Sequence, residues 1–148
     1  MTKHCETNHY PYSAAQLYDL VWNVDDYPKF LPWCKASRIL ERQDDYFVAE
    51  LVISFKHITE QYTSKVTGTA PTDTQAGSID VQLIKGPFKH LSNHWEFIPT
   101  ESGCDLKFEV DFAFSNIILD KLIGALFTRA SEKMAGAFIA RARELYGN

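Results

Sequence analysis

The stretch DLKFEVDFAF, Asp105 to Phe114, alternates apolar and charged residues over most of its length. Successive side chains of a β-strand point to opposite faces, so this alternation predicts a strand with one apolar face and one charged face. The apolar face carries Leu106, Phe108, Val110, Phe112 and Phe114, and the charged face carries Asp105, Lys107, Glu109 and Asp111. The pattern indicates a sheet that packs against a core on one side and meets solvent on the other.

Upstream of this strand the chain contains further strand-like segments separated by short breaks. They are a short N-terminal strand, Arg38 to Leu40, Tyr46 to Phe55, Ile58 to Thr67, Ser78 to Lys85 and Phe88 to Ile98. The breaks contain turn-forming residues, such as QDD at Gln43 to Asp45 and GP at Gly86 and Pro87. Because short breaks between consecutive strands form hairpins, we expect an antiparallel sheet.

Helical patterns flank the strands. Ser13 and Gln16 form a capping-box pattern, which predicts a helix that begins there. From Asn116 to Tyr146 apolar residues recur every three or four positions, which predicts one long amphipathic helix. Gly124, Gly136 and neighbouring alanines leave little bulk on that helix, so either the sheet packs tightly against it or a ligand approaches it closely.

The segment YPKFLPWC, Tyr27 to Cys34, joins the first helix to the sheet and is unusually apolar for a connector. Pro28 and Pro32 remove backbone donors and disfavour helix at the residues before them, so we expect an irregular segment. So many exposed aromatics would make an adhesive surface, so the segment either plugs the core or forms the rim of a cavity. Composition alone favours the plug.

Composition also bounds the possible functions. At 148 residues the chain has the length of one domain, and its net charge of −4 provides no overall positive field for nucleic acid, including DNA, or for an anionic membrane. A local basic patch stays open. Its three widely spaced cysteines, without a CxxC pair, suit free thiols in a reducing compartment. The first residues, MTKHCETNHY, contain no apolar run and predict no secretory signal, and the most apolar stretch, Ile117 to Phe127, is too short to span a membrane.

Patterns that would indicate catalysis are weak. His90 and His94 lie roughly 13 Å apart on one predicted strand, which is too far for a shared metal ion. His90, His94 and Glu96 are separated by even numbers of residues, so they share one face of the strand, which we expect to be solvated. Cys34 has no evident base partner, so we expect a buried structural thiol. We therefore predict no catalytic residue, no metal site and no catalytic cofactor.

Three segments together resemble a known family: YPKFLPWC (Tyr27 to Cys34), EQYTSKV (Glu60 to Val66) and GPFKHLSNHWEF (Gly86 to Phe97), followed by the long C-terminal helix. Over nearly its whole length the chain resembles the coenzyme Q-binding, START-like proteins of the polyketide cyclase/dehydrase and lipid transport superfamily. The resemblance implies an α+β helix-grip fold, also called Bet v 1-like, in which a curved antiparallel sheet and the long C-terminal helix enclose an apolar cavity. It also implies that residues 1–148 form a single START-like ligand-binding domain.

Under this resemblance the Tyr27 to Cys34 connector lies at the mouth of the cavity and becomes a candidate lid. Asn93 is a polar group among the apolar residues of its strand face. It either bonds to neighbouring backbone or, together with Tyr62, recognises an oxygenated head group. The candidate ligand-binding residues are Tyr27, Phe30, Leu31, Trp33, Tyr62, Phe88, Leu91, Asn93, Trp95, Leu122, Leu126, Met134 and Phe138.

The resemblance implies a non-enzymatic protein that binds and delivers a hydrophobic small molecule. The leading expectation is ubiquinone or another polyprenyl quinone, in support of respiratory electron transport. The same bacterial branch includes ribosome-association toxins, so binding to the large ribosomal subunit is the alternative, and a polyketide cyclase or aromatase-like enzyme is the third. The basic residues that could contact a ribosome are Lys85, Lys89, Arg129, Lys133, Arg141 and Arg143. We expect the protein in the cytoplasm, and transient contact with the inner face of the membrane or with the respiratory chain stays open.

Overall fold

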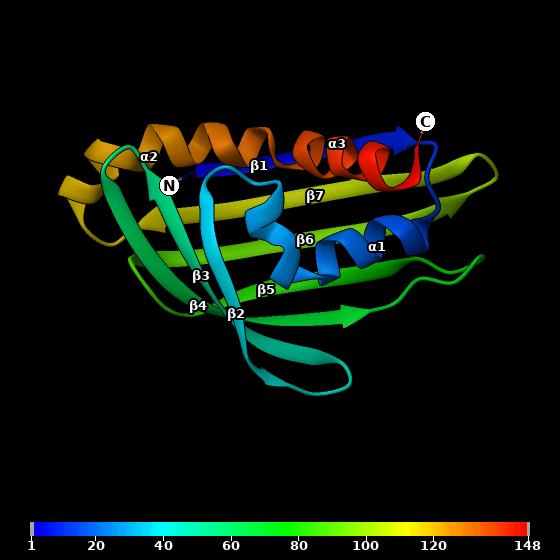
Figure 1. The fold of residues 1–148 in the computed structure, drawn as a ribbon, viewed down its shortest axis with the longest axis horizontal. Helices are drawn as coiled ribbons and strands as arrows, with labels where there is room; N and C mark the ends of the chain where they lie inside the picture. The colour runs from blue at the N-terminus through cyan, green and yellow to red at the C-terminus, as the bar shows by residue number, and fades with distance from the viewer. Residues whose placement is uncertain (1, 148) are drawn as a thin grey trace.

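The computed structural model describes residues 2–147, which form one antiparallel sheet with helices on its inner face (Figure 1). Within these residues seven strands pair in the order β1-β7-β6-β5-β4-β3-β2. Every neighbouring pair is antiparallel, as the short breaks predicted, and β1 and β2 are the two edges. The strands are β1 Thr2–Tyr10, β2 Cys34–Arg42, β3 Tyr46–Phe55, β4 Ile58–Thr69, β5 Gly77–Lys85, β6 Phe88–Thr100 and β7 Gly103–Phe114.

The helices lie in two groups along the chain. Helix α1 (Ala14–Trp22) and the short 3-10 helix η1 (Val24–Lys29) connect β1 to β2, and α2 (Ile117–Glu132) and α3 (Met134–Tyr146) follow β7. The predicted capping box of α1 is confirmed: the Gln16 amide donates to Ser13 Oγ at 3.1 Å, and the Ser13 amide donates to Gln16 Oε1 at 3.0 Å. Within residues 2–147, no helix combines the length and the apolar character needed to cross a membrane.

The sheet curves around the C-terminal helices. Helix α2 contacts β7 and β1 at one edge of the sheet and also reaches β3 near the opposite edge. In Figure 1, α2 and α3 run along β1 and β7, while α1 lies over β5 and β6. One helix can touch both sides of such a sheet only if the sheet twists and curls around it. The arrangement is the helix grip that the resemblance implied.

The long C-terminal helix that periodicity predicted is in fact two helices. Lys133 separates α2 from α3, with backbone angles of φ −99° and ψ 1°. Just before the break, the Ser131 hydroxyl donates to the Phe127 carbonyl at 2.9 Å. Such a side-chain bond competes with the backbone ladder and favours a bend. The apolar stripe continues across the break, so periodicity alone could not reveal it.

Three strand pairs contain register shifts that interrupt strict alternation: β2–β3, β4–β5 and β6–β7. β2 is longer at both ends than predicted, and its register shifts after Cys34 and after Ile39. A bulge interrupts the strict alternation on which the prediction depended. In β6 the register shifts between Phe88 and His90, and both Phe88 and Leu91 are buried as a result.

Aromatic rings fill most of the space between the inner face of the sheet and the C-terminal helices. The Trp95 ring on β6 lies 4.5 Å from the Phe108 ring and 5.3 Å from the Phe138 ring, measured between centroids. Phe127 of α2 packs 4.6 Å from Phe112 of β7. Burial of each such side chain contributes roughly 1.5 to 3 kcal/mol, so this cluster holds the helices against the sheet.

Candidate functional site

A groove of about 850 Å³ opens where α2 meets α3. Three parts of the chain line it: the inward side of β1, the Pro32–Trp33 connector together with the β3–β4 hairpin, and the α2–α3 junction. Pockets that hold small molecules commonly measure about 300 to 1,000 Å³. The groove is therefore large enough to be a ligand site.

Its lining combines apolar walls with charged groups. Trp33, Phe55 and Leu126 contribute large apolar side chains. A few charged groups around apolar walls are typical of sites that orient a ligand while burying most of it. The charged residues of the groove are Glu6, Lys56, Arg129, Glu132 and Lys133.

Small residues on α3 leave space in the groove. Gly136 and Ala137 both line it, and a Cβ built on Gly136 would meet no heavy atom within 4 Å. Gly124 differs, because it is buried and its added Cβ would lie 2.9 Å from Asp120 Oδ1. Of the two interpretations of these small residues, Gly136 therefore fits the approach of a ligand better than tight packing against the sheet.

Edge strand β1 contributes polar residues to the groove that the sequence pattern did not reveal. Glu6 pairs with Phe108, and Asn8 pairs with Leu106. Paired residues point to the same face of a sheet, and Phe108 and Leu106 are buried. Glu6 and Asn8 therefore face inward despite their polarity. The only signal in the sequence was that Glu6 and Asn8 are two residues apart and so share one strand face. Which face that is becomes clear only from the pairing of β1 with β7.

The segment Tyr27–Cys34 is more regular than predicted. Its first three residues belong to η1, and Pro28 fits there because a 3-10 turn needs the φ value that proline imposes. The Leu31 amide then donates to the Tyr27 carbonyl at 2.9 Å, and the Cys34 amide donates to the Leu31 carbonyl at 3.0 Å. Consecutive turns thus replace the irregular connector that the prolines suggested.

This segment is anchored on α3. The Tyr27 and Phe30 rings pack edge-on against Phe138, with centroids 5.3 Å and 5.1 Å away. The Arg141 guanidinium lies 5.5 Å from the centroid of the Phe30 ring. The Tyr27 hydroxyl donates to the Val21 carbonyl at 2.5 Å, and burial raises the pKa of this phenol far above its ordinary value. These contacts link the connector to α1 and α3 at once.

The enclosed space between sheet and helices is much smaller than the groove. It measures about 60 Å³, roughly the volume of two water molecules. Burial strongly raises the pKa of Tyr62, which lines this space. A quinone ring cannot fit there without rearrangement of the aromatic side chains. The predicted site residues that line this space are Tyr27, Trp33, Tyr62, Asn93, Trp95 and Met134.

The remaining predicted residues lie elsewhere. Leu126 lines the large groove, as Trp33 also does. Four others are buried in the core: Leu31, Phe88, Leu91 and Phe138. Phe30 is half-buried against Phe138. Leu122 is 56% exposed and lines neither space, because the face of α2 that packs on the sheet carries Leu119 and Ile123.

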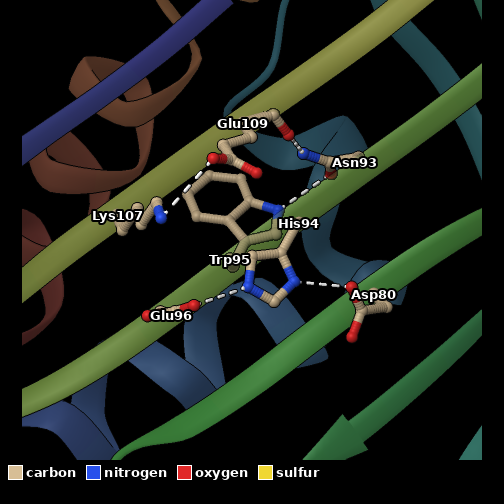
Figure 2. A network of polar contacts seen from close by, with 7 residues as sticks. All are labelled: Asp80, Asn93, His94, Trp95, Glu96, Lys107 and Glu109. Atoms are coloured by element: carbon tan, nitrogen blue, oxygen red, sulfur yellow. Dashed lines mark hydrogen bonds and ion pairs between the residues drawn. The ribbon is translucent and has the colours of Figure 1, made fainter.

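Asn93 uses both ends of its amide within the protein (Figure 2). Its Nδ2 donates to the Glu109 carbonyl at 2.7 Å, and its Oδ1 accepts from Trp95 Nε1 at 2.9 Å. A buried indole N–H needs an acceptor, and Asn93 provides it. The geometry favours the structural interpretation of Asn93 over head-group recognition.

On the outer face of the sheet, His94 lies between two carboxylates (Figure 2). Its Nδ1 is 2.5 Å from Asp80 Oδ1, and its Nε2 is 3.0 Å from Glu96 Oε1. Partial burial lowers the pKa of His94, but the two carboxylates outweigh burial and raise it overall. His90 pairs separately with Asp111 at 3.0 Å. Across residues 2–147 no group of three His, Cys, Asp or Glu side chains is arranged to hold a metal ion.

Two of the cysteines are buried free thiols. Burial raises the pKa of Cys34 and of Cys104 to about 11, so both are protonated at neutral pH. A protonated, buried thiol is a poor nucleophile. The environment of Cys34 is that of a structural residue.

Two of the six basic residues considered for ribosome binding lie in the groove lining and not on a separate surface. Arg129 and Lys133 line the groove, and Arg141 stacks on Phe30 of the connector. The other three are exposed: Lys85, Lys89 and Arg143. Part of this positive charge therefore lies in the groove at the α2–α3 junction.

Fold and groove together define a helix-grip protein with an accessible groove. Residues 10–139 match the family described as polyketide cyclase / dehydrase and lipid transport, and the chain belongs to this family. The ribosome association toxin RatA of Rickettsia prowazekii is 47% identical over 135 residues, which cover 91% of this chain and 92% of that protein. The mitochondrial coenzyme Q-binding protein COQ10 homolog B of Xenopus laevis is 32% identical over 140 residues, which cover 92% of this chain but 56% of that protein.

Solved structures agree with this assignment. The 18 kDa protein CC1736 of Caulobacter crescentus is 37% identical and covers 100% of both chains, with a TM-score of 0.74. A STAR-related lipid transfer protein of Xanthomonas axonopodis has a TM-score of 0.75 at 12% identity, covers 95% of this chain and 85% of that one, and shows the START-like fold alone. The family description names cyclases and dehydrases as well as lipid transport, so membership leaves catalysis and ligand carriage both open.

Proposed function

We propose that this protein binds a hydrophobic small molecule in the groove at the α2–α3 junction, and that the ligand is a quinone with an apolar tail. The observation that carries the proposal is the groove of about 850 Å³ with apolar walls and a few charged groups. The name of the COQ10 relative, a coenzyme Q-binding protein, supports a quinone as the ligand. Delivery of that quinone in the cytoplasm, in support of respiration, is the role that fits such a carrier.

Different lining residues can contact different parts of a quinone. Quinone carbonyls accept hydrogen bonds, and Arg129 and Lys133 are donors without any acceptor atom. Trp33 offers an aromatic surface against which a quinone ring can stack, and Phe55 and Leu126 offer apolar contacts for the tail. The groove is open, so a long tail need not be enclosed.

A substitution at Gly136 tests the groove without disturbing the core. Gly136→Leu places a side chain in open space, and leucine favours a helix over glycine by about 1 kcal/mol, so the variant should be as stable as the parent or more so. The added side chain should lower affinity for a short-tailed ubiquinone analogue at least about tenfold, because it occupies volume that the ligand needs. Quenching of tryptophan fluorescence gives the dissociation constant, and thermal unfolding reports the fold.

The matched control for this variant is Ala140→Leu. Ala140 is exposed on the same helix, one turn further on, and does not line the groove. Leucine there should leave quinone affinity within about twofold of the parent, as expected for a surface change. If folded Gly136→Leu binds the quinone analogue as tightly as Ala140→Leu does, the groove is not the ligand site.

Association with ribosomes is a second candidate function. It is favoured by the identity of 47% to a protein named ribosome association toxin RatA, over 91% of this chain. Arg129 and Lys133 at the groove supply positive charge that can meet RNA phosphates. The two candidate functions would then share the α2–α3 junction.

A further inference from the structure

The start of α2 carries an exposed aliphatic patch that the groove does not explain. Ile117 is 72% exposed, Ile118 is 65% exposed and Leu122 is 56% exposed. In Figure 1 the first turn of α2 projects from one end of the molecule, beyond the ends of β6 and β7. We call these three residues the tip patch. Isolated apolar residues on a surface are ordinary, whereas a group on a projecting turn indicates contact with something apolar.

The projecting turn is well formed, so its exposure is not a frayed helix end. Asn116 Oδ1 accepts from the Ile118 amide at 2.8 Å and from the Leu119 amide at 3.3 Å, which caps the helix. The preceding residue, Ser115, donates to the Pro87 carbonyl from its amide at 2.9 Å and from its hydroxyl at 3.0 Å. These bonds fix the start of α2 against the β5–β6 turn, which Lys85 and Lys89 flank in the sequence.

Positive charge surrounds the tip patch. Residues 84–89 and 115–122 contain Lys85, Lys89 and Lys121 against the single acid Asp120, a local net charge of +2 in a chain of net charge −4. Within residues 2–147 none of the three lysines forms an ion pair. This end of the molecule therefore complements an anionic surface, although the whole chain does not.

The tip patch also continues into the groove along α2. Ile118, Leu122, Leu126 and Ala130 follow one another at four-residue spacing, which places them on one side of the helix. Leu126 and Ala130 line the groove. One apolar stripe thus runs from the projecting turn to the proposed ligand site.

We propose that the tip patch docks on an anionic lipid surface and brings the groove next to the membrane. Aliphatic side chains on a projecting turn can enter the acyl boundary while flanking lysines meet lipid phosphates. A stable protein interface instead buries roughly 800 Å² on each partner, more than a projecting turn offers. Single-stranded RNA would be met by aromatic stacking side chains, which the tip patch lacks. That a docked protein could exchange its ligand with the membrane rests on the proposed function of the groove.

Vesicle binding by the full chain tests the proposal. The parent protein should co-sediment with phosphatidylcholine vesicles that contain phosphatidylglycerol, and less with phosphatidylcholine alone or at high salt. Ile117→Ser/Ile118→Ser keeps the Asn116 cap and should weaken partitioning at least about tenfold, because two aliphatic side chains no longer enter the lipid. Lys85→Gln/Lys89→Gln/Lys121→Gln should remove the preference for anionic vesicles, since each lysine contributes about fivefold.

Leu145→Ser is the matched control, because Leu145 is 50% exposed near the other end of the C-terminal helices. Its partitioning should equal that of the parent. The proposal is overturned if the parent ignores anionic vesicles, or if Leu145→Ser loses as much binding as the Ile117→Ser/Ile118→Ser variant. It is also overturned if that double variant keeps vesicle binding and instead loses self-association or ribosome association.

A solution assay separates this proposal from the function of the groove. Ile117→Ser/Ile118→Ser should bind a short-tailed ubiquinone analogue as the parent does, because neither residue lines the groove. Quinone binding without vesicle binding in the parent overturns the docking proposal and leaves the ligand site standing. Vesicle binding without quinone binding supports the docking surface and overturns the ligand site.

Discussion

At the scale of single residues, Asn93 and Trp95 show how a half-buried polar residue can support a core. The Asn93 amide joins the Trp95 indole on its own strand to the Glu109 carbonyl on β7 (Figure 2). Its two bonds satisfy groups that would otherwise be buried without partners. Such groups are costly to leave unpaired, which explains a polar side chain on a face of aromatic residues.

Asn93→Leu tests this role. Leucine has a similar size but no acceptor for Trp95 Nε1 and no donor for the Glu109 carbonyl, so the free energy of unfolding should fall by about 1 to 3 kcal/mol. Chemical denaturation measures the change, and the exposed neighbour Ser92→Ala should shift it by about 0.5 kcal/mol or less. Quinone affinity should stay unchanged. A variant that is as stable as the parent yet no longer binds quinone would assign Asn93 to head-group recognition.

At the scale of elements, the connector Tyr27–Cys34 has features of both a plug and a lid. Tyr27 and Phe30 pack on Phe138, which favours a fixed plug, whereas Trp33 lines the open groove. The Ser54 amide donates to the Trp33 carbonyl at 2.9 Å, so this end of the connector is tied to β3. The two ends of the connector can therefore respond differently to a ligand.

Hydrogen exchange can distinguish lid from plug. Lids of this kind open on microsecond to millisecond timescales, and a ligand that holds a lid closed slows exchange of its amides. Adding a short-tailed ubiquinone analogue should slow exchange at Trp33, Cys34 and Ser54 more than at Lys107 and Glu109 on the outer face. Slower exchange at the α2–α3 junction without any change in Tyr27–Cys34 would mean that the connector is a static plug.

The elements that sequence could predict are those with local signals. The alternation of Asp105 to Phe114 is carried by β7, and the Ser13–Gln16 capping box starts α1, because both depend only on nearby residues. The break at Lys133 and the inward direction of Glu6 could not be predicted in this way. The break accompanies a hydroxyl bond inside the helix, and the direction of Glu6 depends on pairing with a strand about a hundred residues away.

At the scale of the whole molecule, the Trp33 end of the connector and two of the basic residues considered for ribosome binding meet at the groove. Arg129 and Lys133 belong both to the groove lining and to the residues considered for ribosome binding. Sequence alone could not predict this overlap, because spacing along a helix does not show which residues line the same groove. The structure makes the two functions candidates for mutual exclusion.

We therefore expect a bound quinone to weaken association with ribosomes. A ligand in the groove contacts Arg129 and Lys133 and removes them from RNA phosphates, so a saturating short-tailed ubiquinone analogue should release the protein from ribosomes in co-sedimentation experiments. Arg129→Gln/Lys133→Gln should mimic this release and reduce the salt dependence of association, because fewer cations meet phosphates. Arg143→Gln is the control, since Arg143 is exposed and outside the groove. If association with ribosomes is unchanged by saturating quinone while Arg143→Gln abolishes it, the ribosome contact lies on the outer side of α3 and the two functions are independent.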